Sequence, residues 1–126
     1  MKTILFSCCA LPLLLSNLAE AGINGTYKVR GTETEAGDKY SFSGSVKVAS
    51  YLNGTYALKF SDGDSATYKF KFTKPLKETT ASQTVTARNS IGTSTATFYS
   101  KSGKRWVKFS YKSLDGSVKG QGTGSK

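Results

Sequence analysis

Apolar and polar residues alternate one by one along most of the chain between Gly25 and Lys112. Such a period of two is typical of strands that bury one face. From residue 39 to residue 48, for example, Tyr, Phe, Gly and Val alternate with Lys and Ser. Nowhere in this region do apolar residues recur at the spacing of three and four that a helix requires. The pattern therefore predicts an all-β chain.

Turn signals divide this region into short strands. Residues 35–38 and Asp62-Gly63 carry turn residues, and Asn53-Gly54 is the kind of pair that tolerates positive φ in a hairpin turn. Pro75 ends another strand, because proline cannot donate a ladder hydrogen bond. Residues 101–104 form a further turn.

The second half of the chain contains fewer large apolar residues. We expect two Thr- and Ser-rich strands over about 82–90 and 93–100, followed by a strong strand through Val107. Residues 116–126 are dotted with glycine and form either a short closing strand or a flexible tail.

These elements predict an antiparallel up-and-down meander of seven or eight strands, either closed as a small barrel or folded as a two-layer sheet. Closure is favoured because it removes the two bare edge strands of an open sheet. From residue 22 onward, Phe, Tyr and Trp together outnumber Val, Leu and Ile. The core is therefore expected to be aromatic, with either a filled interior or a ligand-filled lumen.

Two segments of the meander repeat each other. Asn-Gly-Thr-Tyr occurs at 24–27 and again at 53–56, which suggests a duplicated hairpin unit.

The run Gly25-x-Tyr27-x-Val29-x-Gly31, with Tyr40, Gly44-x-Val46-x-Val48 and Tyr56-x-Leu58 after it, resembles a motif of small secreted β proteins. It is more loosely similar to calycin-type barrels of the lipocalin and avidin kind, although no Gly-x-Trp pair stands on the first strand. The resemblance implies a meander fold and no particular ligand.

The first 21 residues have the anatomy of a signal peptide. Lys2 gives a positive start, a short apolar run follows, and Ala19-Glu20-Ala21 has the small-x-small form that signal peptidase cuts. A membrane anchor would need about 20 apolar residues, and this run is interrupted. We expect cleavage after Ala21, a single β domain over 22–126, and a secreted or periplasmic protein without a transmembrane segment.

The composition excludes several kinds of chemistry. The chain has no histidine, and its two cysteines, Cys8 and Cys9, lie in the expected signal peptide. Ser-His-Asp and Cys-His catalysis, zinc or haem ligation by His or Cys, and disulfides are therefore excluded from the mature domain. Asp62 and Asp64 offer too few oxygens for calcium, so we expect no metal and no cofactor.

Positive charge is the strongest functional signal. Removal of residues 1–21 takes away one cation and one acid, so the net charge of +10 is retained. The lysines and arginines alternate with the apolar residues, so they are expected on the exterior, where they either bind a partner or keep the protein soluble. Expected partners are an acidic glycan, lipopolysaccharide or an anionic lipid surface, with nucleic acid not expected. The densest predicted binding cluster consists of Lys101, Lys104, Arg105, Trp106 and Lys108.

Acidic residues are few, which makes catalysis a poor hypothesis. Glu33, Glu35 and Asp38 gather near the first hairpin and are the one set that suggests a paired acid and base. At a hairpin tip we expect them to be solvated. The chain is thus predicted to be a secreted non-catalytic binding protein that engages an anionic or amphipathic partner through its basic exterior or a barrel end. The alternative is a structural module of an envelope or matrix.

Overall fold

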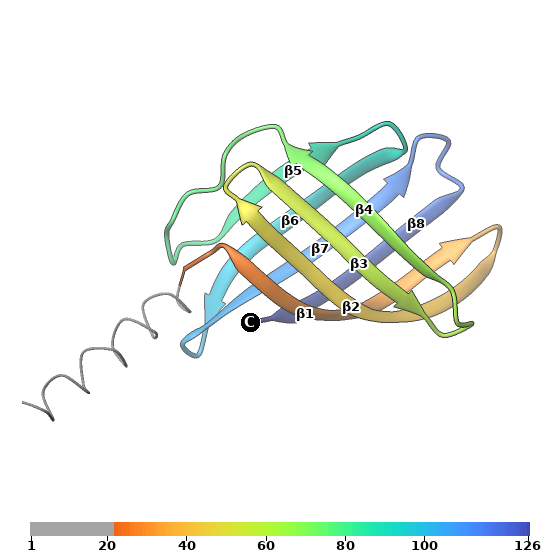
Figure 1. The fold of residues 1–126 in the computed structure, drawn as a ribbon, viewed down its shortest axis with the longest axis horizontal. Coiled ribbons are helices and arrows are strands. Elements are labelled where there is room, and N and C mark those ends of the chain that lie inside the picture. Colours follow the sequence, from red (N-terminus) through yellow and green to blue (C-terminus); the bar gives the residue numbers. More distant parts are fainter. Residues whose placement is uncertain (1–21) are drawn as a thin grey trace, which may run out of the picture.

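The fold is an eight-stranded antiparallel β-barrel, seen in a computed structural model that describes residues 22–126 (Figure 1). The predicted signal peptide, residues 1–21, lies outside the described residues. Within 22–126 every regular element is a strand. The strands are β1 (Gly25–Glu35), β2 (Asp38–Ser50), β3 (Asn53–Phe60), β4 (Ser65–Phe72), β5 (Gln83–Arg88), β6 (Gly92–Lys101), β7 (Lys104–Ser113) and β8 (Val118–Ser125).

The meander closes because the last strand pairs with the first. β8 pairs antiparallel with β7 on one side and with β1 on the other, from Lys28↔Ser125 to Glu35↔Val118. The barrel alternative is therefore the one that the structure has, and the two-layer sheet is wrong. Of the two alternatives for residues 116–126, the structure has the closing strand, which is bonded along both edges.

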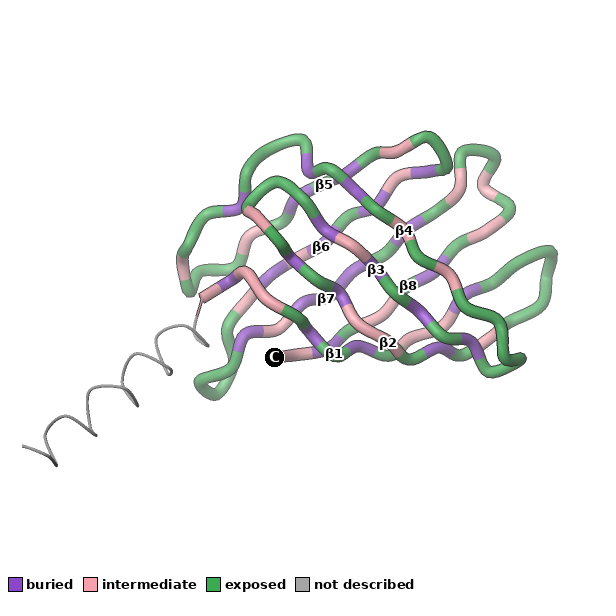
Figure 2. The backbone as a smooth tube through the Cα atoms, in the orientation of Figure 1, coloured by how far each residue is buried: buried purple, intermediate pink, exposed green. Residues whose placement is uncertain are grey.

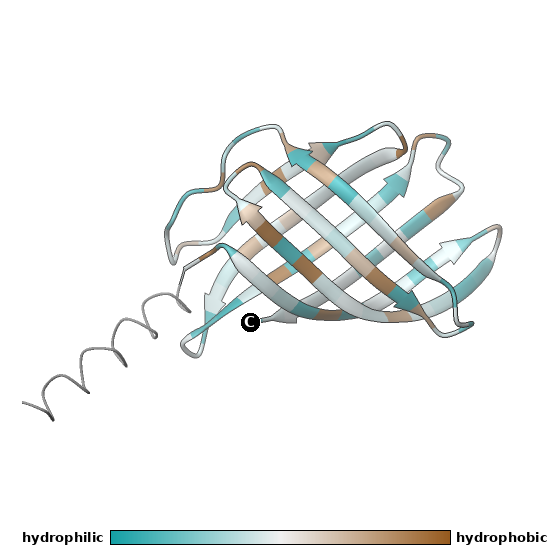
Figure 3. Ribbon diagram, in the orientation of Figure 1, coloured by the Kyte–Doolittle hydropathy of each residue, from teal (hydrophilic) through white to brown (hydrophobic). Residues whose placement is uncertain are grey.

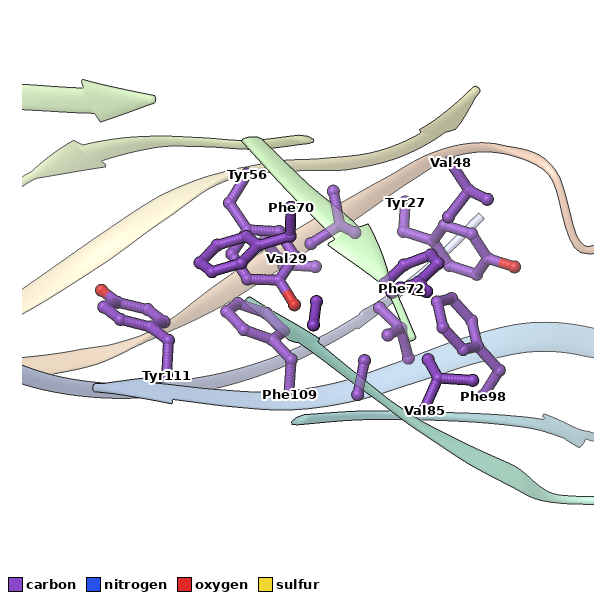
Figure 4. Packing of buried hydrophobic residues seen from close by; sticks show 14 of the residues in the cluster. Tyr27, Val29, Val48, Tyr56, Phe70, Phe72, Val85, Phe98, Phe109 and Tyr111 are labelled. Carbon is purple, nitrogen blue, oxygen red and sulfur yellow. The ribbon is translucent and has the colours of Figure 1, made fainter. Parts of the chain in front are cut away.

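Alternation of exposed and buried residues along the strands produces the core (Figures 2 and 3). Tyr27 and Val29 of β1, for example, are buried, and Lys28 and Arg30 between them are exposed. The core is aromatic, as expected (Figure 4). Most of its ring pairs are edge-on or tilted, and Phe109 and Tyr111 are stacked. Tyr56 is central to it, with ring centroids 5.0 Å from Phe70 and 4.8 Å from Phe109.

Glycines on the inner face make room for these rings. A Cβ at Gly120 of β8 would lie 2.2 Å from Cζ of Tyr111, so the tyrosine ring rests directly on the glycine backbone. Gly54 of β3 accepts the ring of Phe72 in the same way, at 2.9 Å. The predicted turn at Asn53-Gly54 is therefore wrong. The turn lies at Tyr51 and Leu52, and both residues of the pair belong to β3.

The repeated Asn-Gly-Thr-Tyr segments flank the same strand. Tyr27 of β1 and Tyr56 of β3 both pair with Val46 of β2, one from each side. Both phenol rings are fully buried, and both hydroxyls are hydrogen-bonded, to Ile23 O at 2.6 Å and to Ser94 Oγ at 2.6 Å respectively. The repeat therefore corresponds to two inward tyrosines at the same level of the barrel.

The two ends of the barrel differ in composition. The acidic end comprises the turns β1–β2, β3–β4, β5–β6 and β7–β8. The capped end comprises the other three turns, together with residues 22–24 and Lys126. Five of the seven acidic residues in the described chain stand on turns of the acidic end: Glu35, Asp38, Asp62, Asp64 and Asp115.

Candidate functional site

The predicted binding cluster around Trp106 is only partly assembled in the structure. Lys101 and Lys104 face each other across the β6–β7 turn, and the Lys101 Nζ atom lies 6.0 Å from the centroid of the Trp106 ring. Lys108 stands two residues further along β7 on the same outward face. Three lysines and the indole therefore do share one surface.

Arg105 does not belong to that surface, which corrects the expectation. It alternates with Trp106 and so points inward, where its side chain is only 10% exposed. Its Nη2 atom lies 2.7 Å from Oε2 of Glu78, and its Nη1 atom donates to Thr79 O. Glu78 Oε1 in turn accepts the backbone N–H of Ile23 at 2.8 Å. Arg105 thus fastens the β4–β5 loop and the N-terminal segment over the capped end.

The outward aromatic surface is larger than the sequence indicated. Tyr99 of β6 pairs with Trp106 across the ladder, and their rings stack at 14° with centroids 6.4 Å apart. The Nε1 atom of Trp106 is buried and has no hydrogen-bond partner among the described residues. The exposed part of the indole is therefore carbon surface, which suits contact with the apolar face of a ligand.

A shallow groove runs from Trp106 across β8 and β1 to β2. Its walls include Lys28 and Arg30, and hydroxyl-bearing residues such as Thr123, Ser43 and Ser45 line much of the rest. A second hollow continues from Arg30 past Thr123 to Lys108 and Ser110. We call this continuous surface the basic groove: Trp106, Lys28, Arg30, Lys108 and the Ser and Thr residues between them.

Cations in the basic groove follow a regular spacing. Lys108, Thr123, Arg30, Ser43 and Lys59 are successive cross-strand partners on β7, β8, β1, β2 and β3. A cation therefore occurs on every second strand of this row. Because neighbouring strands lie about 4.8 Å apart, the backbone positions of these cations are about 10 Å apart.

The barrel wall as a whole carries charges of one sign. The strands of the described chain contain three acidic residues. Glu35 and Asp38 flank the β1–β2 turn, and Glu33 faces inward. The outward charges between the turns are all positive, so no wall acid offsets them. The exposed cations of the wall, apart from those at the β4–β5 loop and the β6–β7 turn, are Lys28, Arg30, Lys39, Lys47, Lys59, Lys69, Lys71, Arg88, Lys108, Lys112 and Lys119.

Glu33 is a functional candidate whose position the sequence analysis misjudged. It was expected to be solvated, but it is only 6% exposed and lies inside the acidic end. The Tyr111 hydroxyl donates to its Oε1 atom at 2.6 Å, and the Tyr68 hydroxyl approaches the same atom at 3.4 Å. Glu33 has the same alternation parity as Tyr27 and Val29, and that signal would have predicted its inward direction.

Burial and the carboxylate change the acidity of both phenols. Burial, and secondarily the hydrogen bond to Glu33, raises the pKa of Tyr111 far above its ordinary value. Burial and the charge of Glu33 raise the pKa of Tyr68 to about 12. Both hydroxyls therefore stay protonated at neutral pH and act as donors. Glu35 and Asp38 lie at the turn, so the three carboxylates do not form one pair of acid and base.

Neither a metal-binding cluster nor a membrane-spanning helix is found in residues 22–126. Residues 22–126 contain no cluster of three or more His, Cys, Asp or Glu side chains that is placed to hold a metal ion. The same residues contain no helix of the length and hydropathy that crossing a membrane requires. No protein-family model, curated protein or solved structure matches the chain significantly, so the site has to be interpreted from its own chemistry.

Proposed function

We propose that this is a non-catalytic binding protein, secreted or periplasmic, that holds an acidic polysaccharide in the basic groove. The observation that carries the proposal is the one-signed barrel wall, on which the basic groove combines Lys28, Arg30 and Lys108 with the outward indole of Trp106. Cations attract the acid groups of a polymer, and an aromatic ring offers a flat apolar contact for a sugar ring.

The groove favours a sugar polymer over a lipid surface. Nine of the 20 residues that line it are Ser or Thr, whose hydroxyls donate and accept hydrogen bonds as sugar hydroxyls do. A membrane-surface site needs apolar side chains that enter the acyl region. The exposed large aliphatic and tyrosine residues, however, lie on turns at the two ends of the barrel: Tyr51, Leu52, Ile91 and Leu114.

The absence of acids from the basic groove supports binding without catalysis. General acid-base hydrolysis of a glycosidic bond ordinarily uses a pair of carboxyl groups beside the bond. Among the residues that line the two hollows of the groove, no Asp or Glu occurs. We therefore favour a binding role over the enzyme alternative, and the structural-module alternative is separated by the experiment below.

The test is calorimetric titration with polygalacturonate, with neutral dextran and phosphatidylglycerol vesicles as comparisons. We expect binding to polygalacturonate that weakens as salt rises, because salt screens exposed charges beyond about 8 Å at physiological ionic strength. Dextran should bind weakly and vesicles less well than the polymer. Failure to bind polygalacturonate at low salt would contradict the proposal and favour the structural module.

Matched triple variants locate the site. Serine at Lys28, Arg30 and Lys108 removes three cations from the basic groove, and serine at Lys69, Lys71 and Arg88 removes three exposed cations from β4 and β5. Exposed ion pairs contribute about 0.5 kcal/mol each, so the first triple should lose affinity by about tenfold. The second triple should lose less than about threefold. Equal losses would show that net charge, rather than the groove, governs binding.

A further inference from the structure

A second candidate site lies at the acidic end, where the barrel wall is incomplete. β5 is six residues long and pairs with β4 only through Lys71↔Arg88 and Phe72↔Ala87. Beyond these pairs the Asn89 side chain donates to Lys69 O at 2.9 Å, and residues 65–68 of β4 have no strand partner on that side. The short strand therefore leaves a lateral opening between β4 and the β7–β8 hairpin.

A cavity of about 210 Å³ fills this opening. Its walls are mainly aromatic and aliphatic, and the Ile91 side chain at its edge is 51% exposed. A cavity of about 150 Å³ lined by apolar residues holds benzene, so this one has room for a single ring with a short substituent. The lining residues are Tyr68, Phe70, Ile91, Gly92, Tyr111, Lys112, Ser113 and Val118.

A carboxylate stands behind the cavity. Tyr68 and Tyr111, which line it, are the two residues whose hydroxyls point to Glu33. Both hydroxyls address Oε1, and no described residue donates a hydrogen bond to Oε2. The Tyr68 contact of 3.4 Å is at the long limit of a hydrogen bond. Glu33 does not line the cavity itself, but its Oε2 atom retains capacity to accept a further donor directly behind the two lining tyrosines.

Negative charge gathers at the same end of the barrel as the cavity, on the β1–β2 and β3–β4 turns. Tyr40, on the inner side of β2 near the turn, has a pKa raised first by the charge of Asp38 and then by burial. Asp62, Glu35 and Asp64 raise it further. The carboxylates of two different turns thus act on one phenol, which indicates a negative potential at the acidic end. These charges attract a cation toward this end of the barrel, against the single positive charge of Lys112 at the cavity wall.

We infer that the cavity binds a small molecule that carries one ring-sized apolar group and one protonated amine. The ring occupies the space between Tyr68, Phe70 and Val118, and the ammonium group donates to Glu33. The rings of Tyr68 and Tyr111, whose centroids are 5.3 Å apart, both line the cavity, and aromatic rings stabilise a cation nearby. This site is independent of the basic groove, because it lies at the end of the barrel and selects the opposite charge.

The test compares benzylamine, benzyl alcohol and benzoate, which share one ring and differ in charge. Titrations followed by amide chemical shifts should give the tightest binding for benzylamine, by at least about tenfold over benzyl alcohol, because a hydrogen bond to a charged group is the stronger kind. Benzoate should bind least. Absence of binding by all three probes, or benzoate binding as tightly as benzylamine, would overturn the inference.

Two matched variants complete the test. Glu33→Gln keeps the side-chain size and should remove the preference for benzylamine while retaining benzyl alcohol binding. Glu35→Gln, the same change at the exposed turn, should alter benzylamine affinity by less than about threefold. An unchanged preference in Glu33→Gln would overturn the role of Glu33. If Glu33→Gln does not fold, Val118→Phe, which fills the cavity, should abolish binding of benzylamine and benzyl alcohol alike, and retained binding would place the ligand elsewhere.

Discussion

The two ends of the barrel differ in how far they bury their aliphatic residues, although Leu52 at the capped end is also exposed, at 37%. At the capped end, Ile23 is fully buried and Leu76 is 4% exposed, whereas at the acidic end Ile91 is 51% exposed and Leu114 is 71% exposed. The capped end is fastened by the hydrogen bonds and ion pair among Ile23, Glu78 and Arg105. Among the described residues, no buried aliphatic side chains close the acidic end in a comparable way.

In this meander, the residues that stabilise the fold and the residues that are free to bind a ligand lie at different ends of the barrel. The strands of an up-and-down barrel supply the same ladder at both ends, so the closure of an end depends on what the connecting segments contribute. The long β4–β5 connection reaches over the capped end with Leu76, while the short β5 opens the wall near the acidic end. We therefore expect substitutions at the capped end to affect folding and those at the acidic end to affect ligands.

The largest expected effect distinguishes the two ends directly. Ile23→Ala and Leu76→Ala each remove a buried aliphatic side chain and should lower the free energy of unfolding by about 3 kcal/mol. Their counterparts Ile91→Ala and Leu114→Ala remove exposed side chains and should change it by less than about 0.5 kcal/mol. Urea unfolding of the four variants measures this difference. Equal losses from both pairs would show that the acidic end is as tightly packed as the capped end.

A smaller effect is expected from the ion pair at the capped end. Arg105→Ala removes the arginine donor from Thr79 O and from Glu78 Oε2, and we expect a loss of about 2 kcal/mol, since Glu78 is partly hydrated. Lys101→Ala and Lys104→Ala, on the adjacent exposed turn, should change the free energy of unfolding by less than about 0.5 kcal/mol. An unchanged free energy of unfolding in Arg105→Ala would mean that burial of Ile23 and its hydrogen bonds to Glu78 and Tyr27 hold the N-terminal segment without the ion pair.

Alkaline pH should lower the free energy of unfolding through buried tyrosines at both ends of the barrel. Burial raises the pKa values of Tyr27 and Tyr111 far above 10 and that of Tyr56 to about 12. The folded state therefore keeps protons that the unfolded chain loses, and this stabilisation is fully present well below pH 10 and declines as the pH approaches and passes 10. From pH 9 to pH 10 we expect a combined loss of about 1 kcal/mol. Constant stability over that range in urea titrations would contradict the burial of these hydroxyls.

The alternation of residues predicted most of the fold, because each strand exposes one face and buries the other. On β7, for example, alternation buries Val107, Phe109 and Tyr111 and turns Trp106 and Lys108 outward. The turn at Asn53-Gly54 was misassigned because a glycine that accepts a ring from a distant strand looks like a turn glycine in sequence.

The candidate sites were predicted less well than the fold, because Glu33 and Arg105 were expected at the surface and both point inward. Glu33 and Arg105 both have inward parity, and applying the alternation strictly to charged residues would have placed both inside. Their partners could not be predicted, because Tyr111 is 78 positions from Glu33 and Glu78 is 27 positions from Arg105. Those contacts depend on the closure of the barrel and on the path of the β4–β5 loop.

The central claim is that the basic groove and the acidic end are separate binding regions of opposite charge preference. Amide chemical shifts recorded with polygalacturonate and then with benzylamine test it most directly. The account predicts that the polymer shifts amides of β7, β8 and β1 around Trp106 and Arg30, and that the amine shifts amides of β4 and the β5–β6 turn around Tyr68 and Ile91. Coincident sets of shifted amides, or polymer-induced shifts spread evenly over all eight strands, would contradict it.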